Sequence, residues 1–227
     1  LQPMLHSTPS EYMKSLSVER QRLLAHCIPA PQHTWATVKT FYQLTILSYS
    51  PQNAIETATD GGLKNRLGTF GWVMTGANTH FLSGAGPVDG DPETSSSTRS
   101  EWFGYAALLE GLLMIATLHP PHLVRGPIPV HTWIDNKAVA DHIIEFLDPT
   151  FIPSRAYPHD ADIISHIQWL WKQLPLFTFS AGWVQSHQDK QGQIQLSTLQ
   201  NNAQLNVLAD GLATEYYNHG LHRPLHQ

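Results

Sequence analysis

The stretch AIETATDGG, residues 54–62, predicts a β-strand over 54–59 that leads directly into Asp60. We expect the strand to end at Gly61 and Gly62, because paired glycines usually mark a turn. Two further short segments, 69–75 and 80–83, are typical of strands, and a polar loop over 84–97 follows them. Three consecutive strands with short connections predict an antiparallel meander.

Downstream of the meander, helical and strand patterns alternate. The predicted elements are helix 98–118, capped by Ser97 or Thr98, strand 130–134, helix 136–146, helix 159–173, strand 177–184 and helix 202–217. The two later strands need crossover connections, so we expect them to run parallel to the first strand. The predicted fold class is therefore α/β, with a five-stranded mixed sheet (three antiparallel strands, then two parallel strands) flanked by helices.

The first 50 residues have a different pattern. Residues 11–26 predict an amphipathic helix with Ser10 as its N-cap, and residues 35–47 fit either a helix or a strand. We therefore divide the chain into an N-terminal helical extension or connection segment, 1–50, a main domain, 51–218, and a C-terminal tail, 219–227. Since the sequence begins with Leu1 rather than Met, we expect it to be a piece of a longer protein.

The composition narrows the classes of protein that fit. No run approaches the roughly 18 to 20 apolar residues of a membrane span, and the N-terminus lacks the layout of a signal peptide. We therefore expect an intracellular protein, cytoplasmic or nuclear, that is neither secreted nor held in a membrane. The single cysteine, Cys27, excludes an internal disulfide framework and a multi-cysteine zinc site. The net charge of −5 is unusual for a nucleic-acid-binding protein, unless metal ions neutralise some carboxylates.

Four acidic residues occupy positions from which their side chains can converge. Asp60 and Asp135 each follow a predicted strand, and ligand sites collect outside the carboxyl ends of parallel strands. Glu101 lies in the first turn of a predicted helix, and Asp210 lies in the last helix among small and apolar neighbours. Taken singly, each has an ordinary alternative. Asp60 could belong to a turn, and Glu101 could simply favour the helix dipole. Asp135 could be an N-cap, and Asp210 could lie on a solvated helix face. As a set they favour a metal site, because an aspartate on a buried face is costly without a partner.

The order of these residues resembles the type 1 ribonuclease H family, including the ribonuclease H domains of retroelement reverse transcriptases. The segments that carry the resemblance are TDGG at 59–62, GTFGW at 68–72, RSE at 99–101, WIDN at 133–136, WVQSH at 183–187 and NVLAD at 206–210. Each motif alone is weak, but together they follow the family's order over roughly residues 53 to 218. The resemblance implies a ribonuclease H-like fold for the main domain.

The resemblance also implies an activity, cofactors and residue roles. The activity is hydrolysis of the RNA strand of an RNA–DNA hybrid, with Asp60, Glu101, Asp135 and Asp210 as ligands of two Mg²⁺ ions, for which Mn²⁺ can substitute. His187 would assist proton transfer or product release. Gly61, Gly62, Thr98, Arg99 and Asn136 would contact the substrate. The implied partner, besides the hybrid, is an upstream reverse transcriptase domain in the same polyprotein, and the oligomeric state stays open.

Two features keep an alternative open. Many family members carry a basic, tryptophan-bearing protrusion, whereas the interval 148–159 holds a single positive residue, Arg155. We therefore expect the chain alone to bind a hybrid weakly. The loop 188–201 is long and rich in glutamine, and its role is open. The alternative function is a catalytically silent scaffold or nucleic-acid-binding domain of a larger protein.

Overall fold

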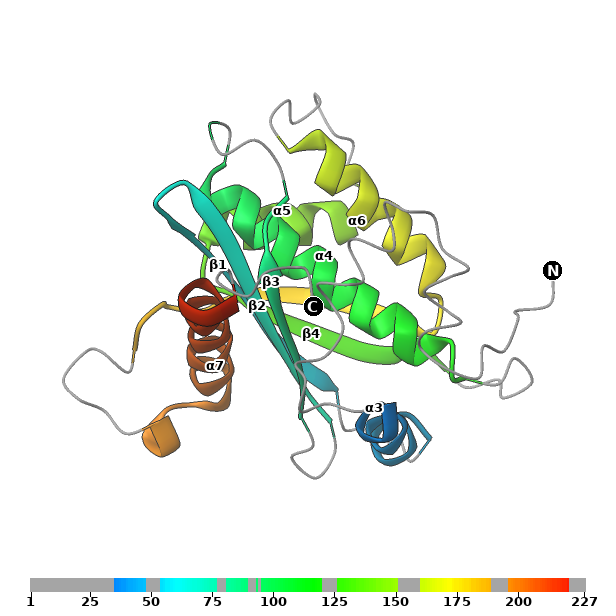
Figure 1. Ribbon diagram of the computed structural model, residues 1–227. Helices are drawn as coiled ribbons and strands as arrows, with labels where there is room; N and C mark the ends of the chain where they lie inside the picture. The colour runs from blue at the N-terminus through cyan, green and yellow to red at the C-terminus, as the bar shows by residue number, and fades with distance from the viewer. Residues whose placement is uncertain are drawn as a thin grey trace, which may run out of the picture.

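The computed structural model describes residues 35–47, 54–76, 81–89, 93, 95–119, 126–150, 160–188 and 196–220 (Figure 1). The predicted helix 11–26 and most of the predicted tail lie outside these residues. Within the described residues, no helix is both long enough and apolar enough to cross a membrane.

A single five-stranded sheet forms the centre of the fold. Its strands are β1 (Ile55–Lys64), β2 (Leu67–Thr75), β3 (Phe81–Pro87), β4 (Ile128–Ile134) and β5 (Phe177–Trp183), in the spatial order β3-β2-β1-β4-β5. The pairs β1·β2 and β2·β3 are antiparallel, and the pairs β1·β4 and β4·β5 are parallel. The predicted meander, the two parallel strands and the α/β class with a five-stranded mixed sheet flanked by helices are thus confirmed.

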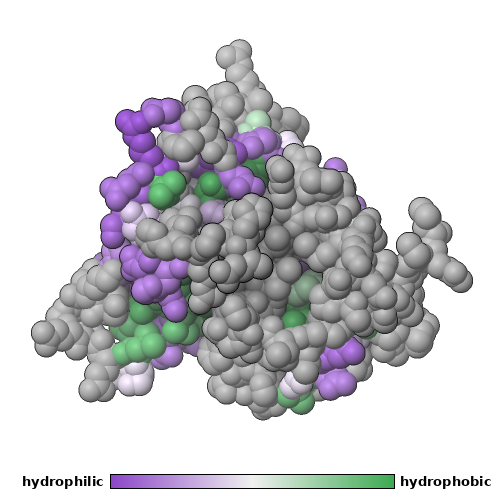
Figure 2. Space-filling view, in the orientation of Figure 1, coloured by the Kyte–Doolittle hydropathy of each residue, from purple (hydrophilic) through white to green (hydrophobic). Residues whose placement is uncertain are grey.

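The first two strands are longer than the sequence suggested. The prediction that Gly61 and Gly62 end the first strand is wrong, because both glycines pair with β2 and β1 continues to Lys64. The turn lies instead at Asn65 and Arg66, whose φ angles of 51° and 63° are the left-handed values that a tight hairpin requires. The exposed end of this hairpin projects from the body, and hydrophilic residues gather over that region in Figure 2.

The third strand also departs from the prediction. It continues to Pro87, because its residues up to that point pair with β2, and the predicted loop over 84–97 therefore begins later.

Helices cover the two faces of the sheet unequally. The helices α4 (Ser97–Ala116), α5 (Lys137–Leu147) and α6 (Ala161–Gln173) lie on one face, and α7 (Asn201–Glu215) lies on the other against β1 and β2 (Figure 1). Helix α4 is buried along almost its whole length. Its N-cap is Ser96, whose hydroxyl accepts a hydrogen bond from the Arg99 backbone at 3.0 Å, and not Ser97 or Thr98 as predicted.

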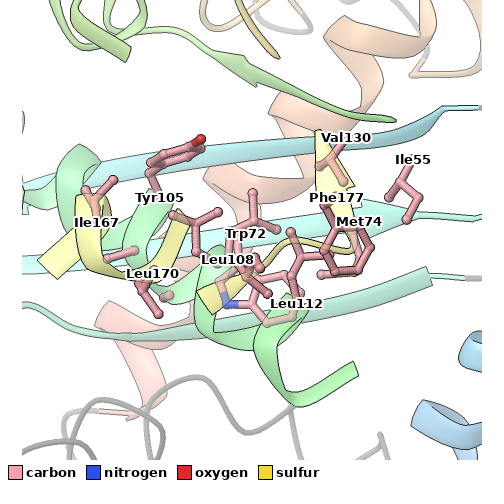
Figure 3. Packing of buried hydrophobic residues seen from close by; sticks show 14 of the residues in the cluster. Ile55, Trp72, Met74, Tyr105, Leu108, Leu112, Val130, Ile167, Leu170 and Phe177 are labelled. Carbon is pink, nitrogen blue, oxygen red and sulfur yellow. The ribbon is translucent and has the colours of Figure 1, made fainter. Parts of the chain in front are cut away.

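The main core fills the space between the sheet and α4. In Figure 3, Trp72 from β2 packs beside Leu108 and Leu112 from α4, and α6 adds Ile167 and Leu170. A smaller apolar cluster on the opposite face joins Ala58 and Val73 of the sheet to Leu205 and Ala209 of α7. These two layers fix α4 and α7 on opposite sides of β1.

Residues 35–47 are helical, which resolves the open choice between helix and strand. They form α3 (Trp35–Phe41) and a π-helical turn, η1 (Tyr42–Leu47). Four of their side chains are buried in the main core, namely Val38, Phe41, Tyr42 and Ile46. The Tyr42 hydroxyl also lies 3.2 Å from Nδ1 of His119, at the end of α4. These residues therefore pack as part of the same core, although they precede the predicted start of the main domain.

Candidate metal centre

Three carboxylates meet beside the sheet, from β1, from α4 and from the connection between β4 and α5. One oxygen each of Asp60, Glu101 and Asp135 lies within 4.8 Å of the others. The last parallel pair of β1 and β4 is Thr59 with Ile134, so Asp60 of β1 and Asp135, the residue that follows β4, come next along the two chains. The expectation that neighbouring strands bring these two aspartates together is confirmed, although Asp60 lies within β1 rather than at its end.

The contact between β1 and α4 brings Glu101 into the group. At Gly61, an added Cβ atom would lie 2.3 Å from the backbone nitrogen of Glu101. Only glycine permits an approach this close without displacing the helix. The Gly61 backbone also hydrogen-bonds the Glu101 carboxylate. The first glycine of the pair therefore sets the distance between the helix and the strand.

The carboxylates are crowded and shielded from water. Asp60 is 8% exposed and Glu101 is 3% exposed. Burial, followed by the charges of Asp135 and Asp210, raises the pKa of the Asp60 carboxyl from 3.8 to about 8. Burial, followed by the charges of Asp60 and Asp135, also raises the pKa of Glu101 well above its ordinary value. A cation bound among these carboxylates would therefore stabilise their charged forms.

Within the described part of the chain, a buried carboxylate oxygen of the site lacks a hydrogen-bonding partner, as a metal ligand would when no metal is bound. The Oε2 atom of Glu101 is buried and has no hydrogen-bonding partner among the described residues. None of the described ion pairs joins a lysine or arginine to Asp60, Glu101 or Asp135. A buried carboxylate oxygen without a donor is costly, and a hard cation satisfies both its charge and its coordination. These three residues can hold a metal ion.

Asp210 approaches from the opposite face of the sheet on α7. At Gly71 of β2, an added Cβ would lie 2.3 Å from the carbonyl oxygen of Ala209, so α7 packs directly on the strand backbone. Asp210 lies near enough for its charge and a side-chain hydrogen bond to affect Asp60, but it is not part of the three-residue group. The sequence analysis assigned no role in the site to Gly71, although a glycine inside a strand often marks a close backbone approach.

His187 lies on the outer side of Asp210. Its Nδ1 atom is 3.5 Å from Oδ2 of Asp210, and the two side chains are 53% and 24% exposed, respectively. The residue has a φ of 52°, a left-handed conformation that is uncommon outside glycine. The imidazole is thus held beside a carboxylate while it stays open to solvent.

The remaining predicted site residues have local structural partners. Asn136, and not Asp135, caps α5, because its side chain accepts a hydrogen bond from the Val139 backbone at 3.3 Å. The guanidinium of Arg99 is bound to Asp162 at 2.7 and 3.0 Å and to Asp160 at 3.3 Å. Thr98 is half-buried on α4. An added Cβ at Gly62 would meet only Thr69, at 3.6 Å. The substrate contacts predicted for these residues stay predictions.

Comparison with known proteins gives a likeness of fold alone. No family model matches the sequence, and no curated protein matches it either. An RNase H1 from Halobacterium salinarum is similar in structure, with 15% identity, a TM-score of 0.43 and coverage of 73% of this chain and 98% of the other.

Two further solved structures are similar to the same degree. For the N-terminal RNase H domain of a Mycobacterium tuberculosis protein, the identity is 14%, the TM-score 0.44 and the coverage 73% and 95%. For an RNase H1 isolated from compost by a metagenomic approach, the values are 17%, 0.46, 74% and 99%. Because these identities are so low, the function of this chain has to be argued from the geometry of its own site.

Proposed function

We propose that the chain hydrolyses the RNA strand of an RNA–DNA hybrid with two divalent metal ions, Mg²⁺ or Mn²⁺. The observation that supports this is the meeting of Asp60, Glu101 and Asp135 within 4.8 Å, with a buried Glu101 oxygen left without a partner. The proposed ligands are these three residues and Asp210. The order of the motifs in the sequence connects this chemistry with ribonuclease H.

The ligand chemistry supports magnesium or manganese rather than a softer metal. All four proposed ligands are carboxylates, and hard oxygen ligands suit Mg²⁺ and Mn²⁺. The described carboxylate group also lacks the cysteine and histidine ligands that zinc prefers. When bound, the ions would activate the attacking water and stabilise the leaving oxygen of the phosphodiester.

The proposed ligands differ in how far they are exposed to solvent. Asp60 and Glu101 are held by the sheet and by α4 in buried positions, so they preserve the geometry of the site. Asp210 is more exposed and lies next to His187. We propose that the His187 imidazole carries a proton between the reaction site and solvent, or assists departure of the product, since it contacts one carboxylate and faces water.

Recognition of the substrate would use the backbone around the site more than cationic side chains. The proposed contacts are Gly61, Gly62, Thr98, Arg99 and Asn136, whose backbone and polar side-chain atoms suit the 2′-hydroxyl and phosphate groups of RNA. With a net charge of −5, the chain has little electrostatic attraction for a hybrid. A partner domain, such as the reverse transcriptase proposed upstream, would supply that attraction.

A cleavage assay tests the proposal. A hybrid labelled on its RNA strand is incubated at low salt with the chain and Mg²⁺, Mn²⁺ or EDTA, beside RNA–RNA and DNA–DNA duplexes of the same sequence. We expect cleavage of the RNA strand of the hybrid with either metal and none in EDTA. Asp135→Asn should lower the rate by at least about 100-fold, in line with the loss of a group that stabilises the transition state. Cleavage that persists in EDTA contradicts the metal mechanism, and no cleavage with either metal favours the silent scaffold.

A further inference from the structure

Trp183 is a large aromatic residue at the end of β5 that remains 48% exposed. Its indole nitrogen Nε1 nevertheless donates a hydrogen bond to the backbone carbonyl of Asp135, at 2.9 Å. An exposed indole N–H can be satisfied by water at little cost, so an ordered bond to one particular carbonyl requires an explanation.

The carbonyl of Asp135 lies at a gap between two hydrogen-bonding systems. The pairing of β4 with β5 ends at Ile134, whose own carbonyl accepts from the Val184 backbone at 3.0 Å. The ladder of α5 begins one residue later, where the Asn136 carbonyl accepts from Ala140. The Asp135 carbonyl therefore belongs to neither the sheet nor the helix. Among the residues that the structure describes, the Trp183 indole donates to it.

We propose that Trp183 is a positioning residue for the metal centre. Its indole N–H holds the Asp135 peptide, and thereby directs the Asp135 carboxylate toward Asp60 and Glu101. The inference rests on the proposed function, because it assumes that this carboxylate is a metal ligand. A ligand whose backbone is fixed in advance needs less ordering when the metal binds, so metal affinity should depend on this bond.

The chain offers a matched control for this bond. Trp171 also donates its indole N–H within the chain, to the hydroxyl of Tyr105 at 3.2 Å, but this pair links α6 to α4 in the main core. Trp171→Phe and Trp183→Phe thus remove the same kind of hydrogen bond, one in the core and one at the carboxylates. A merely structural role for Trp183 would give both variants the same behaviour.

Two measurements on the full chain separate the roles. Isothermal titration calorimetry with MnCl₂ gives the metal dissociation constant, and urea unfolding in EDTA gives the stability without metal. For Trp183→Phe we expect metal binding to weaken about 3- to 10-fold, the usual effect of one hydrogen bond, with the unfolding midpoint unchanged. For Trp171→Phe we expect a lower unfolding midpoint and unchanged metal affinity, because the buried Tyr105 hydroxyl loses its donor.

Each outcome has a separate meaning. If Trp183→Phe binds Mn²⁺ as tightly as the wild type, the inference is wrong while the proposed function stands. If the wild type binds no Mn²⁺, the proposed function fails and the inference fails with it. Should Trp183→Phe fold poorly, benzothienylalanine at position 183 removes only the N–H and keeps the ring. Unchanged affinity in that protein overturns the inference equally.

Discussion

Replacing Asp60 by Asn should stabilise the metal-free protein while abolishing its response to metal. Asp60 is buried beside Asp135 and Asp210, which is why its pKa is raised to about 8. A carboxyl whose pKa is raised by folding favours the folded state while it is protonated. That contribution is complete below pH 3.8 and is lost as the pH rises to about 8. The wild-type protein should therefore lose stability over this range when metal is absent.

The magnitude follows from the pKa. Between the ordinary pKa of 3.8 and the folded-state pKa of about 8 there are about four pH units, and each corresponds to 1.36 kcal/mol, which gives on the order of 6 kcal/mol at pH 8. The amide of Asn has a similar shape and does not titrate, so the variant lacks this loss. Since 1 kcal/mol shifts the melting temperature of a chain of this size by roughly 2 to 4 °C, the variant should melt roughly 10 to 25 °C higher at pH 8 in EDTA. At pH 5 the difference should be much smaller.

Thermal unfolding at pH 5 and pH 8, in EDTA and in saturating MnCl₂, tests this reasoning. Manganese should raise the melting temperature of the wild type at pH 8 and leave that of Asp60→Asn unchanged. Asp141→Asn is the matched control, because Asp141 is half-exposed on α5, pairs with Lys137 and does not belong to the carboxylate group. The control should stay within about 0.5 kcal/mol of the wild type. If Asp60→Asn is less stable than the wild type at pH 8 in EDTA, the carboxylates are not under electrostatic stress and the argument fails.

Three other predictions concern the packing around the site. Gly61→Ala should cost about 2 to 4 kcal/mol in urea unfolding, because its Cβ would overlap the Glu101 backbone, whereas Gly62→Ala should be nearly neutral. Arg99→Asp and Asp162→Arg should each lower the free energy of unfolding, and the double variant should recover part of the loss. The expected coupling energy is about 0.5 to 1 kcal/mol. Additive effects would mean that this pair does not hold Arg99, which would leave its guanidinium free for substrate. Deleting residues 1–50 should give insoluble protein, since α3 and η1 contribute four buried side chains to the core; a soluble fragment with native circular dichroism would place the domain boundary at residue 50.

The fold was largely predictable because periodicity reports which face of each element is buried. The alternating residues of the strands and the apolar faces of the helices gave the element order and the mixed sheet. The end of β1 was missed because Gly61 and Gly62 favour turns locally, whereas pairing with Phe70 and Thr69 keeps them in the sheet. Such pairing is a long-range effect that local propensity does not report.

The candidate site was also predictable in part. The positions of Asp60 and Asp135 after neighbouring strands were sufficient to predict their convergence. The partners of Arg99 were not predictable, because Asp162 lies 63 residues along the chain and meets it only through the packing of α6 on α4. The sequence alone could have predicted that Asn136 caps α5, since asparagine is a preferred N-cap. Aspartate is preferred equally, however, so Asp135 was an alternative cap.

The geometry of the carboxylate group depends on β1 being shared by two sets of contacts. Up to Thr59 the strand is paired on both edges, and beyond it only the bonds to β2 continue, so the sheet opens beside Asp60. Helix α4 reaches this opening through the contact at Gly61, and α7 reaches the other face through the contact at Gly71. Because both contacts are made directly to strand backbone, neither helix can move closer or turn without a clash. The missing side chains of Gly61 and Gly71 therefore let α4 and α7 hold Glu101 and Asp210 at fixed positions around Asp60. The fold tolerates the resulting crowding of negative charge where a cation can relieve it.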